Sequence, residues 1–369
     1  MRKTLKLATA ILASNVRRLA FPYKLTLILT YRCNLRCQMC NIWQREARDE
    51  LSLEEYDRFF SRNADFSWIN LSGGEVFLRG DFTRIVDVIM DRCKALYVLD
   101  FPTNGVMTDL IVDGVEQILA RHPKKLIVTV SLDGDEAVHE HLRGVKGSWE
   151  KSVRTFARLR EMRSGRFEAY LGMTLTPRNF DKIQETLEAV RGRIPNITAD
   201  ELHVNVAHQS EHYYENTGMA SLSQRDIEES LHWYRAHRRR RLHPVAFVER
   251  VYQSRIGGFL ATGRTPMPCK ALSASCFIDP TGVVYPCSMD NLPLANLRDH
   301  DYDLRRIWNL PHVVRVRENI EKGHCAQCWT PCEAYQTILG NLIFRPSPAR
   351  TEKTEDAVAE VGSECGKGA

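Results

Sequence analysis

Several sequence signatures of common enzyme classes are missing from this chain. No G-x-G-x-x-G follows a segment that predicts a strand, so a dinucleotide-binding fold has no support. The chain has no G-x-S-x-G turn of the serine hydrolases, and GSECGK near its end lacks the spacing of a phosphate-binding loop. No apolar run approaches the roughly 18–20 residues of a membrane span. The formal net charge of +5 is small and diffuse, so we expect no nucleic-acid partner.

What the chain does contain is the composition and periodicity of a globular α/β protein. Its 369 residues, 43% hydrophobic and 26% charged, are enough for about two domains. Short β-branched segments alternate with segments of helical period, which predicts right-handed βαβ units and a parallel sheet. The predicted strands are residues 24–30, 68–71, 95–101, 125–131, 169–175 and 201–206. Six units fit a partial (β/α)6 TIM-type barrel or an open doubly wound sheet, and both gather ligands at the carboxyl ends of their strands.

Composition divides the chain into five segments. They are a basic amphipathic helix at 1–22, the barrel at 23–242, a connector rich in Gly and Pro at 243–268, a small cysteine-rich domain at 269–345 and a disordered tail at 346–369. The apolar face of the first helix packs on the domain behind it or, alternatively, residues 1–20 rest on an anionic membrane surface. We expect a cytoplasmic protein, with peripheral membrane association as the alternative.

Cysteine is the residue type that points to chemistry. Of eleven cysteines, three lie within residues 33–40 and six within 269–332, which predicts metal ligation in a reducing compartment. The early three, Cys33, Cys37 and Cys40, have C-x3-C-x2-C spacing directly after the first predicted strand. Three thiolates there would hold three irons of a [4Fe–4S] cluster and leave the fourth iron open, since four cysteines are the usual closed set.

At this loop the sequence resembles the radical S-adenosylmethionine (AdoMet) superfamily, and the resemblance extends over residues 24–210. It implies that the open iron binds the amino and carboxylate groups of AdoMet. One electron then cleaves AdoMet to methionine and a 5′-deoxyadenosyl radical, which takes a hydrogen atom from the substrate. The cofactor supplies this chemistry, and the protein supplies position and exclusion of water.

Motifs at the other strand ends match the same family. The resemblance implies that S-G-G-E at 72–75 receives the AdoMet ammonium, because its glycines let the backbone approach closely. It also implies that S-L-D-G at 131–134, together with an R-G pair at 143–144, holds the AdoMet carboxylate. Asn104 lines the pocket or serves its own turn, and either Met39, Ile42 or Trp43 packs on the adenine. The implied AdoMet-binding set is Gly73, Gly74, Glu75, Asn104, Ser131, Asp133, Arg143, Ile42 and Trp43.

The late cysteines form a second candidate cluster site. Their order, with D-P-T-G-V-V-Y-P-C and a later C-x2-C, resembles the auxiliary-cluster domain called SPASM, or its shortened form called twitch. Six cysteines rather than seven imply one auxiliary [4Fe–4S] cluster, with two as the alternative. We expect Cys269, Cys287, Cys325 and Cys328 as ligands, and Cys332 or Cys276 as possible replacements for one of them. Spacing alone leaves zinc as an alternative metal.

These features predict a radical AdoMet oxidoreductase-type enzyme. We expect it to oxidise a small molecule, carbohydrate or lipid precursor, with the auxiliary cluster as electron acceptor. This preference rests on the 23 residues before the first predicted strand, which leave no room for a peptide-binding extension. The alternatives are a maturase that installs a thioether or carbon–carbon crosslink in a ribosomally made peptide, and a non-catalytic iron–sulfur protein. A flavodoxin or ferredoxin is the expected electron donor.

Overall fold

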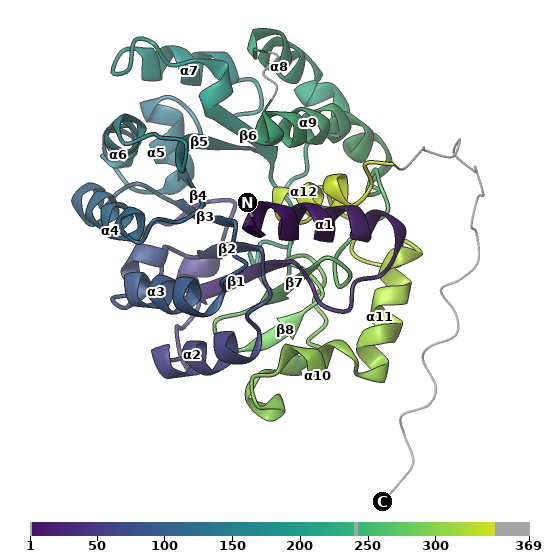
Figure 1. Ribbon diagram of the computed structural model, residues 1–369. Helices are drawn as coiled ribbons and strands as arrows, with labels where there is room; N and C mark the ends of the chain where they lie inside the picture. The colour runs from purple at the N-terminus through teal and green to yellow at the C-terminus, as the bar shows by residue number, and fades with distance from the viewer. Residues whose placement is uncertain (1, 240–242, 344–369) are drawn as a thin grey trace, which may run out of the picture.

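The computed structural model describes residues 2–239 and 243–343 (Figure 1). In these ranges the strands form one nine-stranded sheet with the order β6-β5-β4-β3-β2-β1-β7-β8-β9. Its first six strands are β1 (Lys24–Thr30), β2 (Trp68–Gly73), β3 (Val98–Thr103), β4 (Lys125–Ser131), β5 (Phe167–Leu175) and β6 (Leu202–Val206). Each neighbouring pair among them is parallel. The predicted partial (β/α)6 barrel is therefore confirmed.

The cysteine-rich segment extends the same sheet beyond β1. Strand β7 (Ser275–Ile278) pairs with β1 in parallel, and β8 (Val283–Tyr285) and β9 (Ala295–Asn296) continue antiparallel. The helices of this segment are α10 (Leu304–Trp308), α11 (Pro311–Glu321) and α12 (Pro331–Leu339). Since β1 is bonded to β2 on one side and to β7 on the other, the two cysteine-bearing parts of the chain share one backbone framework.

Helices cover the outer face of the parallel strands (Figure 1). They are α2 (Leu53–Arg62), α3 (Phe82–Arg92), α4 (Thr108–Ala120), α6 (Ser148–Glu161), α7 (Ile183–Arg191) and α8 (Gln224–His237). Their apolar sides form one core with outward strand residues such as Leu27, Leu71 and Val128. The start of α2 shows how local sequence sets a boundary. Ser52 Oγ accepts from Glu55 N at 3.3 Å, and Ser52 N donates to Glu55 Oε2 at 2.8 Å, which is a capping box.

The inner face of the barrel is polar and retains solvent exposure. In β4, Leu126, Val128 and Val130 are buried against helices, whereas the residues between them are partly exposed. Strands β2, β5 and β6 show the same alternation. Successive side chains of a strand point to opposite faces, so the partly exposed set lies inside the barrel. The interior is therefore lined by polar side chains and is not filled as an apolar core.

Helix α1 (Arg2–Val16) crosses the amino ends of the strands (Figure 1). Lys6 Nζ lies 2.7 Å from Asp65 Oδ1, just before β2, and Asn15 Nδ2 donates to Leu339 O at 2.8 Å in α12. This helix therefore packs on the domain behind it, although Leu5 and other apolar side chains on its far side are exposed. Membrane contact through this helix stays a prediction.

The segment expected to be a connector contains a 19-residue helix, α9 (Pro244–Thr262). Its residues Tyr252 and Ile256 are fully buried, and this burial outweighs the roughly 1 kcal/mol that each glycine costs inside a helix. Gly258 has no atom within 4 Å of the place where a Cβ would be, so that glycine leaves no gap in the core. The predicted disordered tail at 346–369 lies outside the described residues.

Candidate active site

The three early cysteines share one short loop that leaves the carboxyl end of β1. Cys37 is buried, and Cys33 and Cys40 are partly exposed. Burial raises the pKa of each thiol, to about 11 for Cys33 and to about 12 for Cys40, and neighbouring thiols add to the effect at Cys33 and Cys40. A metal must displace these protons to bind. The free loop therefore loads metal more readily as the pH rises.

The loop is docked on α5 (Glu136–Arg143) by backbone hydrogen bonds. Arg36 N donates to Arg143 O at 3.0 Å, and Gln38 N donates to Leu142 O at 2.8 Å. Gly144 then ends α5 with a φ of 70°, and a Cβ at this position would lie 2.7 Å from Arg36 O. The glycine of the R-G pair is thus what lets the helix end lie against the cysteine loop.

A buried ion pair brings positive charge to the same thiols. Arg143 Nε lies 2.6 Å from Asp133 Oδ2, with the two side chains 12% and 0% exposed. The other oxygen of Asp133 accepts from Thr174 N at 2.8 Å, so β5 helps to fix the carboxylate. From this position Arg143 Nη1 lies 3.7 Å from Cys37 Sγ. Burial alone would lower the pKa of the guanidinium, but Asp133 and Cys37 raise it above its ordinary value, so the group stays charged.

The two glycines at the end of β2, Gly73 and Gly74, let the backbone lie directly against the cysteine loop. A Cβ on Gly73 would lie 2.3 Å from Thr30 O, and a Cβ on Gly74 would lie 2.2 Å from Arg32 O. Gly74 N donates to Thr30 O at 2.9 Å and closes this contact. No other residue type fits without moving the loop backbone. The two glycines therefore allow the end of β2 to pack against the cysteine loop, in addition to any role in binding AdoMet.

The Glu75 carboxylate is already bonded to donors of the protein. It accepts from Thr103 Oγ1 at 3.0 Å, from Asn104 N at 2.7 Å and from Phe77 N at 3.3 Å. Burial raises its pKa to about 7, although these bonds pull the other way. The resemblance implied that Glu75 helps to receive the AdoMet ammonium. The geometry also makes it a brace between the ends of β2 and β3, and its contact with AdoMet stays a prediction, as does that of the two glycines.

The other predicted AdoMet-site residues lie around the same loop. Asn104 Nδ2 donates to Asn34 Oδ1 at 2.7 Å, so it ties the turn after β3 to the cysteine loop. Ser131 ends β4 on the inner face, in register with Gly172 of β5. Ile42 is buried, whereas Trp43 is partly exposed and its indole N–H has no hydrogen-bond partner among the described residues. Both stay predictions for the adenine contact.

A loop after β6 holds the last part of the cysteine loop. Asn216 Nδ2 donates to Met39 O at 2.9 Å, and Asn41 N donates to Tyr214 O at 2.8 Å. These two bonds flank Cys40 on both sides. A compact apolar cluster backs them, made by Ile28, Tyr31, Ile42, Tyr213 and Phe277. We name residues 207–216 the bridging loop.

The bridging loop also holds the late cysteine segments. Ser210 Oγ donates to Ser288 O at 2.6 Å, and Trp329 N donates to His208 Nε2 at 3.0 Å. Ser288 directly follows Cys287, and Trp329 directly follows Cys328. One loop therefore bonds beside a cysteine of each set and fixes their separation. Sequence reasoning did not find the bonds of this loop, because single polar residues in a loop have no diagnostic spacing.

The four cysteines predicted as auxiliary ligands line one cavity. They are Cys269, Cys287, Cys325 and Cys328, and Met289 and Glu333 complete part of its wall. Burial raises the pKa of these thiols, to about 12 at Cys269. All four thus border the same space, and among the described residues no group of three or more His, Cys, Asp or Glu is close enough to hold a metal ion. A cubane cluster fits such a space, because each thiolate binds a different iron.

Cys276 and Cys332, the two predicted replacement ligands, do not line this cavity. Cys276 Sγ lies 3.9 Å from Lys24 O, within the shared sheet. The carbonyl of Cys332 accepts from Lys24 Nζ at 2.5 Å, and Lys24, Glu333 and Asp100 are charged neighbours of its thiol. The structure thus separates these two thiols from the other four.

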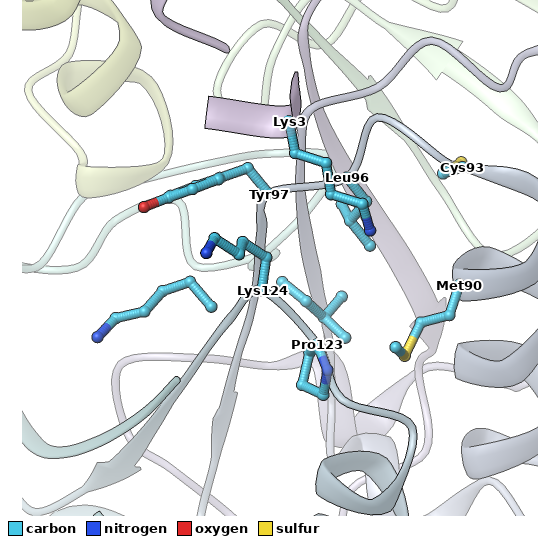
Figure 2. Close-up of a pocket in the computed structure, with 9 residues that line it drawn as sticks. Lys3, Met90, Cys93, Leu96, Tyr97, Pro123 and Lys124 are labelled. Carbon is cyan, nitrogen blue, oxygen red and sulfur yellow. The ribbon is translucent and has the colours of Figure 1, made fainter. Parts of the chain in front are cut away.

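A second cavity lies at the opposite end of the barrel, beneath α1 (Figure 2). Lys3, Tyr97, Pro123 and Lys124 are among its lining residues, together with Cys93. Burial raises the pKa of Cys93 to about 12, which makes this isolated thiol unreactive. The chemistry-bearing residues gather instead at the carboxyl ends of the strands. Among the described residues no helix is both long and apolar enough to cross a membrane.

Family models match both halves of the chain. Residues 27–190 match the model described as the radical SAM superfamily, and residues 269–329 match the SPASM model, described as an iron–sulfur cluster-binding domain. The first range contains the three early cysteines. The second contains all four cysteines that line the auxiliary cavity.

Several proteins are similar to this chain, some along most of its length and one over about half of it. The AdoMet-dependent heme synthase of Methanosarcina barkeri is 27% identical over 81% of this chain and 86% of its own. The mycofactocin maturase MftC of Mycolicibacterium smegmatis is 29% identical over 91% of this chain and 84% of its own. The subtilosin biosynthesis protein AlbA of Bacillus subtilis is 30% identical over 49% of this chain and 39% of its own. The structure of Streptococcus suis SuiB bound to precursor peptide SuiA matches with a TM-score of 0.57 and 17% identity, over 94% of this chain and 77% of SuiB.

These comparisons correct one expectation. A small-molecule, carbohydrate or lipid-type partner was preferred over a peptide, and that preference was wrong. MftC is named a maturase, AlbA is named for the biosynthesis of a bacteriocin, and SuiB was solved with a precursor peptide. The preference rested on the short segment before the first strand, but the length of that segment does not determine which substrate the barrel interior accepts.

Proposed function

Because the chain belongs to the radical SAM superfamily and carries a C-terminal SPASM domain, we propose that it matures a ribosomally made peptide. Its cofactors are AdoMet, a [4Fe–4S] cluster and auxiliary iron–sulfur. When bound, these groups would supply one-electron chemistry, namely hydrogen-atom removal from the substrate at the AdoMet site and uptake of one electron at the auxiliary site during a crosslink-forming oxidation. The observation that carries the proposal is the match to MftC, which runs through both domains of this chain.

The chain's own residues support this role through position. Cys33, Cys37 and Cys40 would hold the first cluster. The buried ion pair with Asp133 fixes Arg143 beside Cys37. A guanidinium in this place suits the carboxylate of AdoMet, with which it can form a charge-assisted fork. Asp133 orients the guanidinium, and the two glycines of the S-G-G-E turn offer backbone to the ammonium.

The bridging loop supports the coupling of two redox sites. It bonds to Met39 and to Ser288, each adjacent to a cysteine of a different set. An oxidative crosslink needs two one-electron events on one substrate, so the two sites must keep a fixed separation while the substrate is bound. Tyr213 of this loop packs on Phe277, and their cluster excludes water from the space next to Cys40.

The experiment supplies the reconstituted enzyme with AdoMet, a strong reductant and, in turn, each peptide encoded by short reading frames beside its gene. We expect one peptide to raise the formation of 5′-deoxyadenosine and to lose two hydrogen atoms, both followed by mass spectrometry. Cys37→Ala abolishes both signals, whereas Cys93→Ala, which alters an isolated buried thiol far from the loop, preserves them.

The contrary result is equally specific. If protease-treated, peptide-free cell extract stimulates AdoMet cleavage and none of the peptides does, the substrate is not a peptide and the proposal fails.

A further inference from the structure

Exposed apolar side chains gather on one face of the molecule, along α1 and at the end of α12. Among the described residues eight large apolar side chains are exposed, and five of them lie here: Leu5, Leu12, Val16, Leu342 and Ile343. The first three are seven and four residues apart, which places them in one stripe along α1. Helix α1 lies beside α12 (Figure 1), and Ile343 N donates to Asn15 Oδ1 at 3.3 Å, so the last two lie next to the stripe. We name these five side chains the α1 face.

The α1 face is a true cluster, because the other exposed apolar side chains are scattered. They lie singly on α4, on α9 and before β9, and are Leu110, Phe247 and Leu292. Single apolar residues on a surface are ordinary, whereas a contiguous patch marks a site of interaction.

Contacts along the opposite side of α1 hold this face outward. Lys6 Nζ lies 2.7 Å from Asp65 Oδ1 near the start of the helix. Near its end Ser14 is buried, and Ser14 O accepts from Lys270 Nζ at 2.9 Å. The helix is therefore fixed to the domain at both ends, and its apolar stripe is presented to the surroundings in one orientation.

Positive charge flanks the α1 face. Residues 1–45 contain no aspartate or glutamate, and residues 2–18 contain five basic side chains. Four cations around α1 form no ion pair with any described residue: Arg2, Lys3, Arg17 and Lys124. Lys3 and Lys124 line the cavity beneath the start of α1 (Figure 2), and Arg17 directly follows its last residue. An apolar stripe with cations at both ends is typical of a helix that lies in the interface of an anionic bilayer.

The place and charge of the α1 face favour a membrane over a protein partner. It lies at the amino ends of the strands, whereas the cysteine loop leaves the carboxyl end of β1. An electron donor must come close to a cluster, so this face does not suit one. In a two-fold dimer the face would meet itself, which brings the same unpaired cations together. A bilayer instead offers acyl chains to the stripe and phosphates to the cations.

We propose that the α1 face docks on the surface of a membrane that contains anionic lipids. The axis of α1 lies in the plane of the bilayer, its leucine and valine side chains enter the acyl boundary, and the flanking cations contact headgroup phosphates. The carboxyl ends of the strands, with the cysteine loop, then point away from the lipid. The inference does not depend on the identity of the substrate.

The test measures binding of the full chain to sedimented vesicles, without substrate. One set contains equal parts of phosphatidylcholine and phosphatidylglycerol, and the other contains phosphatidylcholine alone. We expect binding to the anionic set to be at least about tenfold tighter, because each cation near an anionic surface favours binding severalfold. Added salt should weaken it.

Leu12→Asp is the decisive variant. It should weaken binding to the anionic vesicles by about ten- to hundredfold, since burial of one leucine corresponds to such a ratio. Leu110→Asp on α4 is the matched control, because the two leucines are 62% and 51% exposed, and it should bind as the unchanged chain does. Both positions are on the surface, so equal melting temperatures will show that neither change acts through folding.

The contribution of charge has its own pair of variants. Arg17→Gln should weaken binding to the anionic vesicles about fivefold, which is the effect of one cation at such a surface. Arg178→Gln is the control, because Arg178 is exposed in the loop that follows the carboxyl end of β5, and it should have no effect.

Three results would overturn the inference. The first is equal binding to the two kinds of vesicle, or none to either. The second is equal binding by Leu12→Asp and the unchanged chain, which would leave a contact made by charge alone. The third is a dimer in analytical ultracentrifugation that Leu12→Asp dissociates, which would make the occupant of the α1 face a second copy of the chain.

Discussion

The Asp133→Asn change probes the ion pair that positions Arg143. An amide keeps the shape of the carboxylate but has one acceptor oxygen, whereas Asp133 serves two donors: Arg143 Nε at 2.6 Å and Thr174 N at 2.8 Å. In the variant, one of these donors must face an NH2 group, and the guanidinium loses its buried counter-charge. Asp133 is 0% exposed, so water cannot replace the lost contact.

The cost follows from burial. A hydrogen bond to a charged group contributes about 1.5–3 kcal/mol, and removing one partner of a buried ion pair costs about 3–5 kcal/mol. We therefore expect Asp133→Asn to lower the free energy of unfolding by about 3 kcal/mol. Glu150→Gln is the matched control, because Glu150 pairs with Arg193 at 3.1 Å with the side chains 49% and 56% exposed. An exposed pair is worth about 0.2–1 kcal/mol.

The assay is urea unfolding of the cluster-free protein, followed by tryptophan fluorescence, with AdoMet affinity measured afterwards on the reconstituted protein. Asp133→Asn should lose stability and bind AdoMet more weakly, and Glu150→Gln should do neither. If the two variants lose the same stability to within about 0.5 kcal/mol, then Asp133 does not hold a buried charge and the reasoning about Arg143 is refuted.

Two further predictions use the same site. Gly74→Ala should abolish iron loading of the early cysteine loop, because its Cβ would lie 2.2 Å from Arg32 O. Gly80→Ala is the control and should load iron normally, because no atom lies within 4 Å of its Cβ position. Equal iron contents in the two variants would contradict the close packing at Gly74. Burial raises the pKa of Glu75 and Glu333 from 4.5 to about 7, so the folded state favours their protonated forms. The free energy of unfolding gains from this preference in full below about pH 4.5, and the gain is lost as the pH rises through about 7. The cluster-free protein should therefore unfold more easily at pH 8 than at pH 5 by a few kcal/mol, and a Glu75→Gln, Glu333→Gln double variant should lose less between these pH values; an identical loss would contradict the assignment.

The sequence was enough to predict the barrel, because strand periodicity is a local signal. The six predicted strands coincide with β1 to β6 to within a few residues. The spacing also indicated four late cysteines that the structure places around one cavity, whereas their ligation of a cluster, like that of the early three, stays a prediction. The glycines of S-G-G-E were found for the same reason, although their contact with the backbone of the cysteine loop required the structure.

What could not be predicted depends on contacts between distant segments. Helix α9 was not predicted, because Gly257 and Gly258 are unfavourable inside a helix. Burial of its other residues offsets that cost. The bonds from the bridging loop to Met39 and Ser288 join residues 177 and 78 positions apart in the chain. No spacing rule within a single sequence encodes such relations.

The central claim is that the chain carries two separate iron–sulfur sites built by two sets of cysteines. The direct measurement is the iron and sulfide content of anaerobically reconstituted protein in which Cys33, Cys37 and Cys40 are all alanine. The account predicts about four irons, which belong to the auxiliary cavity, and near zero when Cys269, Cys287, Cys325 and Cys328 are also replaced. Near-zero iron already in the first variant, or zinc in its place, would contradict it.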